Sequence, residues 1–75
     1  MKEQIIKILS ELRPEFDFTQ DVNFIEEGML DSFDIVTLVD SIEEEMGVAI
    51  SGMDVLPENF FSIDAICQTI ERNRK

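Results

Sequence analysis

The feature that most constrains the fold of this chain is the spacing of its aliphatic side chains. Ile5, Ile8, Leu9 and Leu12 stand at i, i+3, i+4 and i+7, which places them on one face of a helix. The same spacing recurs in two later groups: Ile35, Leu38, Val39, Ile42 and Met46, and then Ile63, Ile66, Cys67 and Ile70. The sequence therefore predicts an all-α fold whose helices bury their apolar faces against one another.

Residues that favour helix ends stand at the borders of these groups. Pro14 ends the first predicted helix, because a proline disfavours helical backbone in the residue before it. Asp31 is a predicted N-cap for the second helix, which is expected to end at Gly47. Ser62 is a predicted N-cap for the third. The ends therefore agree with the apolar spacing.

The segments between the predicted helices lack a regular period. Residues 14–30 are too apolar for a solvated linker, because they contain Phe16, Phe18, Val22, Phe24 and Ile25. We expect a loop that packs over the helices, and ordered loops of this length are often functional. Residues 48–53 are expected to be extended, and 53–60 to form at most a short helical turn or two. The predicted architecture is a small bundle of three main helices plus a short helix.

The length of the chain limits what it can hold. Its 75 residues, with no internal repeat or linker, predict a single domain over 1–75. A chain of this size removes only about 60% of its unfolded surface from water. A deep catalytic cavity is therefore not expected. Because 44% of the residues are apolar, including six Phe, the composition still predicts a folded domain.

The charge is strongly acidic and unevenly distributed. Asp and Glu total 17 against 6 Lys and Arg, a net charge of −11, and no basic residue lies between Arg13 and Arg72. Such a surface repels a phosphate backbone, so nucleic-acid binding is excluded. It attracts proteins with basic patches and speeds their encounter, most strongly at low salt.

Three further observations concern location. Cys67 is the single cysteine, so the chain forms no internal disulfide. The first twelve residues lack the apolar core and cleavage site of a secretory signal, and no apolar run is long enough to cross a bilayer. A cytoplasmic protein is expected.

The most informative motif is the Asp31-Ser32 pair. It stands at the start of the predicted acidic second helix, directly after Phe24-Ile25-Glu26-Glu27-Gly28-Met29-Leu30. An Asp-Ser pair in this position resembles the modification site of acyl carrier proteins. The helix order, the long first loop, the acidic second helix and the short third element also match that family, so the resemblance covers essentially the whole chain.

The resemblance implies a covalent cofactor. In this family a phosphopantetheinyl transferase moves 4′-phosphopantetheine from coenzyme A to the serine, and the terminal thiol then carries acyl or aminoacyl groups as thioesters. Ser32 is by resemblance the attachment residue and Asp31 its motif neighbour. A serine in the first turn of a helix lies beside unpaired N–H groups and the positive end of the helix dipole, which favours a phosphodiester there. We expect a non-catalytic, monomeric carrier that also serves a loading enzyme and a downstream acyl-accepting enzyme.

The details of the motif favour one subgroup of carriers. Carriers of fatty acid synthesis usually have Gly-x-Asp-Ser-Leu, whereas here two residues separate Gly28 from Asp31, and Phe33 replaces the leucine. The string 26–33 is more similar to D-alanyl carrier proteins and related freestanding carriers that an AMP-forming ligase loads. We therefore expect a ligase-loaded amino or carboxylic acid as cargo, with fatty acid or polyketide acyl groups as the alternative.

A partner-binding face is predicted on the second helix, beside Ser32. Acidic residues alone would suit a merely solvated face, but exposed apolar side chains next to the serine favour docking. The predicted partner-binding residues are Phe33, Asp34, Val36, Thr37, Asp40, Glu43 and Glu44.

The sequence gives less support to other roles for these residues. Ser32 could simply cap the helix, or act as a nucleophile, but a nucleophile needs a neighbouring base and the chain has no His. Asp21-x-Asn23 begins like a calcium loop, yet Glu26 stands where that loop needs glycine, so no metal site is predicted. The alternative from another class is an unmodified acidic helical adaptor that binds a basic protein.

Overall fold

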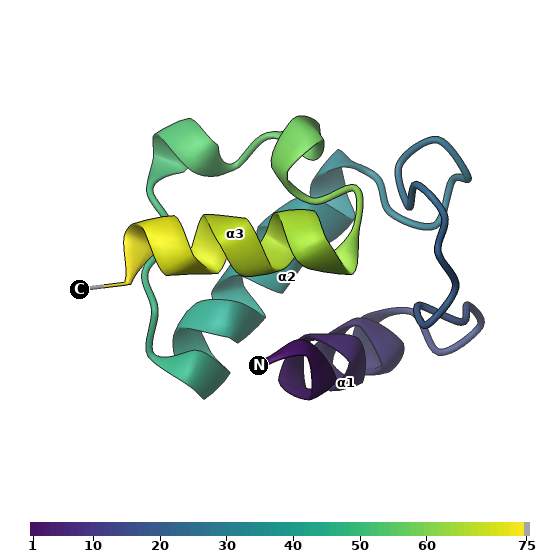
Figure 1. Ribbon diagram of the computed structural model, residues 1–75, viewed down its shortest axis with the longest axis horizontal. Coiled ribbons are helices and arrows are strands. Elements are labelled where there is room, and N and C mark those ends of the chain that lie inside the picture. The colour runs from purple at the N-terminus through teal and green to yellow at the C-terminus, as the bar shows by residue number, and fades with distance from the viewer. Residues whose placement is uncertain (75) are drawn as a thin grey trace.

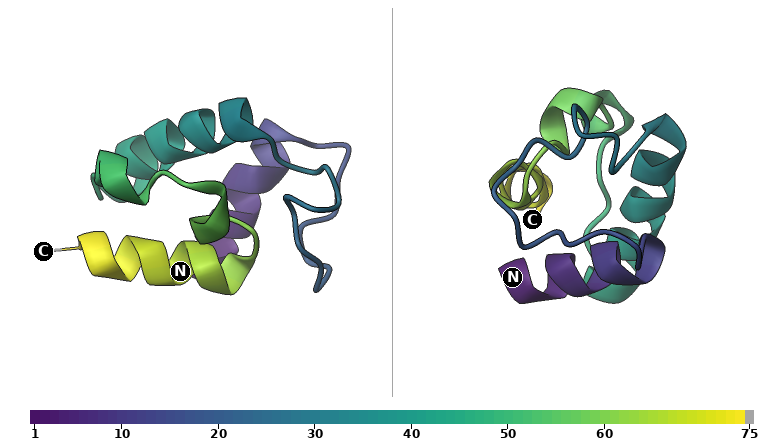
Figure 2. Two further views of the ribbon diagram at one scale, coloured as in Figure 1. Left: turned by 90° about the horizontal axis from the view of Figure 1, so that it is seen from above. Right: turned by 90° about the vertical axis from the view of Figure 1, so that its right-hand side faces the viewer.

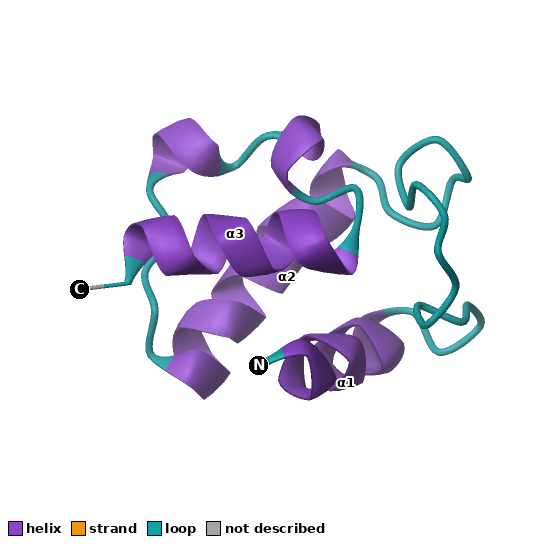
Figure 3. Cartoon of the chain, viewed as in Figure 1, coloured by secondary structure: helices purple, strands orange, loops and turns teal. Residues whose placement is uncertain are grey.

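Three α-helices and two 3₁₀ turns make up the computed structural model, which describes residues 1–74 (Figure 1). The elements are α1, Lys2–Leu12; α2, Ser32–Met46; η1, Gly52–Asp54; η2, Pro57–Asn59; and α3, Ile63–Asn73. Loops make up the rest of the described chain, and no strand occurs in it (Figure 3). The predicted all-α fold with three main helices is confirmed.

The three helices surround a common interior, as the end-on view of Figure 2 shows. α1 contacts both α2 and α3, and η2 contacts α3. Each helix contributes fully buried aliphatic side chains: Ile5 and Leu9, Leu38 and Ile42, and Ile66 and Ile70. Full burial of one such side chain contributes about 1.5–3 kcal/mol, so the periodic apolar positions stabilise the arrangement of the helices.

The observed helix ends agree with the end signals in the sequence. α1 ends at Leu12, and the next residue, Arg13, leaves the helical region with φ −135° and ψ 79°. α2 ends at Met46, and Gly47 follows with φ 69°. Glycine suits that left-handed backbone because it has no Cβ to clash. Ser62 caps α3 by accepting a hydrogen bond from the Ala65 N–H at 3.1 Å.

The segment before α3 forms two separate turns, η1 and η2, in agreement with the prediction of at most a short helical turn or two over 53–60. The interruption lies at Leu56, whose backbone is extended with φ −131° and ψ 145°. Pro57 follows it, and a proline pushes the preceding residue out of the helical region. η1 therefore cannot continue into η2.

The loop between α1 and α2 folds over one end of the bundle, at the right of Figure 1. Phe18 and Phe24 are buried in the core, with their rings edge to face at a centroid distance of 5.1 Å. Phe16, Val22 and Ile25 pack against that core while remaining partly exposed. The prediction that this apolar loop packs over the helices is confirmed.

A side-chain network fastens the η1–η2 segment to α3. Asn73 accepts a hydrogen bond from the Ser51 N–H at 2.9 Å and donates to the Asp54 carboxylate at 2.9 Å. Asn59 donates to the Asp54 carbonyl at 2.8 Å, and the buried Thr69 hydroxyl lies 3.2 Å from the Asn59 carbonyl. These bonds give the irregular segment a defined path although it has few helical bonds of its own.

Cys67 lies partly buried on α3 and packs against the core. Burial raises the pKa of its thiol, so the sulfur stays protonated and poorly nucleophilic at neutral pH. Among the described residues, none of the helices has both the length and the apolar character needed to cross a membrane.

Candidate functional site

Ser32 is the first residue of α2, and it is exposed. The residue before it, Asp31, has extended backbone and acts as the N-cap, so the cap role considered for Ser32 belongs to its neighbour. Within residues 1–74 the N–H groups of Ser32 and Phe33 have no hydrogen-bond acceptor, as is usual in a first helical turn. An exposed hydroxyl beside free N–H donors suits a covalently attached anion.

Asp31 and Asp34 form a reciprocal capping box around Ser32. The Asp31 carboxylate accepts a hydrogen bond from the Asp34 N–H at 2.9 Å. The Asp34 carboxylate in turn accepts one from the Asp31 N–H at 3.1 Å. Two donors of the first turn are thus satisfied by side chains one helical turn apart. The prediction that Asp31 is the N-cap of α2 is confirmed. The hydrogen bond from the Asp31 N–H to the Asp34 carboxylate was not predicted, and it completes the capping box.

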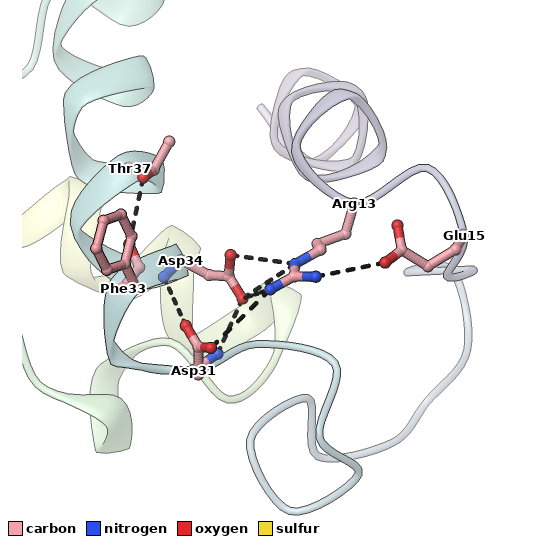
Figure 4. A network of polar contacts seen from close by, with 6 residues as sticks. All are labelled: Arg13, Glu15, Asp31, Phe33, Asp34 and Thr37. Carbon is pink, nitrogen blue, oxygen red and sulfur yellow. Dashed lines mark hydrogen bonds and ion pairs between the residues drawn. The ribbon is translucent and has the colours of Figure 1, made fainter.

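Arg13 connects the end of α1 to this capping box (Figure 4). Its Nε lies 3.1 Å from both carboxylate oxygens of Asp34, and its Nη2 lies 2.9 Å from Oδ2. The same Nη2 is 3.9 Å from Asp31 Oδ2, and Nη1 is 3.4 Å from Glu15. The guanidinium therefore lies among three carboxylates, and its shortest contact is with the most buried of them.

The ionisation of Asp34 depends on this partner. Burial raises the pKa of the Asp34 carboxyl, but the hydrogen bond from Arg13, the Asp31 N–H and the charge of Arg13 together lower it below its ordinary value. The hydrogen bonds and charge of Asp34 likewise raise the pKa of Arg13, which stays protonated. At neutral pH the pair is therefore fully ionised.

This lowered pKa makes the stability of the fold depend on pH through Asp34. A carboxyl with a lowered folded-state pKa adds stability above its unfolded pKa, near pH 4, and loses that contribution as the pH falls through the folded value. We expect Asp34→Asn to be less stable than the wild type at pH 7, with a difference in unfolding free energy that narrows as the pH falls below about 4, the ordinary pKa of an Asp carboxyl. Urea unfolding followed by circular dichroism measures it.

The comparison of the wild type with Asp34→Asn also controls for the other carboxyl whose pKa is lowered, that of Asp17. Asp17, whose pKa is lowered by the side-chain and backbone hydrogen bonds from Thr19, titrates in both, so its contribution cancels from the difference. A gap that stays constant from pH 7 to acid would contradict the assignment of a stabilising charge to Asp34.

The residues before the site are fixed by backbone bonds to Phe24. The N–H groups of Met29 and Leu30 donate to the Phe24 carbonyl at 2.8 and 3.1 Å, and both side chains are buried. Gly28, with φ 73°, makes the tight turn that allows this return. The backbone is therefore fixed by a hydrogen bond at Leu30, two residues before Ser32.

Most of the residues predicted to face a partner are exposed on α2. Phe33 and Val36 are 82% and 54% exposed, and Asp40, Glu43 and Glu44 are also exposed. Thr37 is half-buried, and its hydroxyl donates to the Phe33 carbonyl at 3.2 Å. This face carries two large apolar side chains beside a row of carboxylates.

Asp34 departs from that predicted set. Only 7% of it is exposed, and Figure 4 shows its carboxylate directed towards Arg13, on the opposite side of α2 from Phe33. The N3 position of a helix directs a capping side chain back to the N-cap, which here places it between α2 and α1. Asp34 is therefore part of the support of the site and not of its outer face.

One element of the site has no local signal in the sequence. Arg13 meets Asp34 across 21 residues, a contact that no spacing rule predicts. Away from α2, Met53 and Leu56 of the η1–η2 segment are further exposed apolar residues, 86% and 41%, which the sequence analysis did not single out.

Two surface hollows occur in the described part of the chain, and Ser32 lines neither of them. One is lined by residues 46–51 with 72–74, and the other by the start of α1, residues 18–24 and the start of α3. Ser32 instead lies on open surface at the first turn of α2. That position suits a group that projects from the protein.

A protein-family model described as a phosphopantetheine attachment site matches residues 3–70 of this chain. The match begins in α1, ends in α3 and contains Ser32 together with its capping box.

Proposed function

The chain belongs to the phosphopantetheine attachment site family, and we propose on that basis that it is a carrier whose Ser32 holds the 4′-phosphopantetheine arm. Domains of this family bear that cofactor covalently, and they are generally non-catalytic. When attached, the arm supplies a terminal thiol that holds an acyl group as a thioester. The protein's own residues present and orient the attachment point.

The observation that carries this proposal is the placement of Ser32. Its hydroxyl is exposed at the first residue of α2, and the cap role is already filled by Asp31. Free N–H groups at Ser32 and Phe33 and the positive end of the helix dipole favour a phosphodiester on that oxygen. The chain has no His, so no imidazole is present to activate Ser32 as a hydrolytic nucleophile.

The test of the carrier role is the mass of the intact protein. The protein is incubated with coenzyme A, Mg²⁺ and a broad-specificity phosphopantetheinyl transferase. We expect a gain of one phosphopantetheine, located on the peptide that contains Ser32. If the transferase modifies a control carrier but not this protein, the carrier proposal fails and the acidic adaptor is the better description.

The cargo is proposed to be a small amino or carboxylic acid. The string from Glu26 to Phe33, which resembles D-alanyl carriers, supports loading by a separate AMP-forming ligase. Purified D-alanine ligase should then charge the modified protein. Acceptance of a malonyl group from a transacylase, without charging by the ligase, would favour a fatty acid or polyketide carrier instead.

We further propose that the protein works in the cytoplasm as a monomer.

Enzymes that act on the arm are proposed to dock on the exposed face of α2. Phe33 and Val36 offer apolar contact beside Ser32, and Glu43 and Glu44 attract basic partner surfaces. Glu43→Lys with Glu44→Lys should slow modification by about tenfold at low salt, because steering by opposite charge is lost. The difference should shrink as salt is added.

A matched variant separates this effect from net charge. Glu3 and Glu11 are exposed on α1, so reversing both changes the total charge by the same amount on another helix. This control should be modified at close to the wild-type rate. Equal slowing in the two double variants would show that overall charge, and not the α2 face, sets the rate.

A further inference from the structure

We propose that Arg13 is a positioning residue for the modification of Ser32, because it holds Asp34 in the capping box that orders the first turn of α2. This inference rests on the proposed carrier function. It assigns a role to a residue that follows α1 and lies outside the Asp31-Ser32 pair.

The contact between Arg13 and Asp34 has the geometry of a specific pairing. Two guanidinium nitrogens, Nε and Nη2, reach the carboxylate at 3.1 and 2.9 Å. Such a planar, two-pronged contact fixes the orientation of the carboxylate as well as its charge. A lysine in the same place would supply charge without the fork.

Arg13 is itself held in place by the backbone of α1. Its N–H donates to the Leu9 carbonyl at 2.8 Å, and the Leu9 side chain is fully buried in the core. Pro14 follows directly and restricts the backbone of Arg13. The cation is therefore anchored to a helix that packs against α2.

One oxygen links this anchor to the site. Asp34 Oδ2 accepts from Arg13 Nη2 at 2.9 Å and from the Asp31 N–H at 3.1 Å. Without Arg13, a carboxylate that is only 7% exposed has no cation in contact, and such a group must either take up a proton or turn towards water. Both responses weaken its bond with the Asp31 N–H and loosen the turn that begins with Ser32.

A loosened first turn slows transfer more than it weakens docking. The exposed face of α2 that we propose for docking does not contact Arg13, whereas transfer needs the serine oxygen held in one orientation. Arg13→Gln should therefore lower kcat of the transferase reaction by about fivefold with little change in KM. That factor corresponds to the loss of a helix cap of about 1 kcal/mol.

The experiment measures transferase kinetics on the wild type, Arg13→Gln, Arg13→Lys, Asp34→Asn and the double variant of Arg13→Gln with Asp34→Asn. Lys7→Gln, at an exposed position of α1, is the control for loss of one positive charge. Rates are taken where circular dichroism shows every variant to be folded. We expect Arg13→Lys to recover only part of the rate, and the effect of Arg13→Gln to vanish in the Asp34→Asn background.

Two results would overturn the inference. One is an unchanged kcat in Arg13→Gln, and the other is an equal loss with and without the Asp34 carboxylate, since Arg13 would then not act through it. Failure of the carrier function is a separate outcome, because in that case the wild type itself would gain no phosphopantetheine. Amide exchange at Asp31 and Asp34, faster in Arg13→Gln than in Lys7→Gln, gives a second readout independent of the transferase.

Discussion

Ser32→Ala is expected to gain no phosphopantetheine at all under conditions in which the wild type is fully converted. The hydroxyl is the atom that would form the phosphodiester, and alanine removes it. The substitution should leave the fold intact, because Asp31 and Asp34, not Ser32, satisfy the donors of the first turn. A surface change of this kind usually alters stability by less than about 0.5 kcal/mol. Intact-protein mass and circular dichroism measure both parts of the prediction.

Ser10 provides the matched control for this substitution. It is exposed on α1, so Ser10→Ala removes the same group from a different helix and should be modified like the wild type. Modification of Ser32→Ala to the same extent would place the arm on another residue. It would also remove the reason for treating the first turn of α2 as the site.

Phe24→Ala is expected to lower the free energy of unfolding by about 3–5 kcal/mol, the usual range for truncation of a buried Phe. The Phe24 ring is 1% exposed and meets Phe18 edge to face, so its loss leaves a cavity where the long loop joins the core. That is a large share of the roughly 5–15 kcal/mol that stabilises a typical domain. Because the chain has no Trp or Tyr, urea unfolding is best followed by circular dichroism.

The same substitution at Phe33 tests whether burial of the ring is the cause of the stability loss expected for Phe24→Ala. Phe33 is 82% exposed, so Phe33→Ala should change stability by no more than about 0.5 kcal/mol. It should instead weaken docking, if the α2 face is used as proposed. Comparable losses of stability in the two variants would contradict the assignment of Phe24 to the core.

The helices could be predicted because their signals are local. Aliphatic residues at helical spacing identified the buried faces of α1, α2 and α3, and Asp31, Gly47 and Ser62 identified three of their ends. Each of these signals lies within a few residues of the structure it determines. Ser32 as the attachment residue came from resemblance and from its position in the first turn, and it stays a prediction.

The support of the site could not be predicted, because it depends on contacts between distant segments and on backbone atoms. Nothing near Asp34 indicates Arg13 as its partner, so its carboxylate was predicted to face solvent with Asp40 and Glu43. The bonds from Met29 and Leu30 to the Phe24 carbonyl involve no side chain, so the residue types do not encode them directly. The extended backbone of Leu56 between η1 and η2, by contrast, follows from the local signal of Pro57.

The buried rings of Phe18 and Phe24 and the backbone bonds to the Phe24 carbonyl also determine where the loop between α1 and α2 tolerates a change in length. Thr19, Gln20 and Asp21 are exposed between the two buried rings of Phe18 and Phe24. Extra residues inserted there would lengthen a surface turn, and doubling the length of a flexible loop costs only about 0.6 kcal/mol. Between Phe24 and Asp31 the backbone bonds to the Phe24 carbonyl fix the number of residues, so one insertion would shift Ser32 relative to its cap. A label inserted into the first half of this loop should therefore be tolerated, whereas one inserted into the second half should displace Ser32.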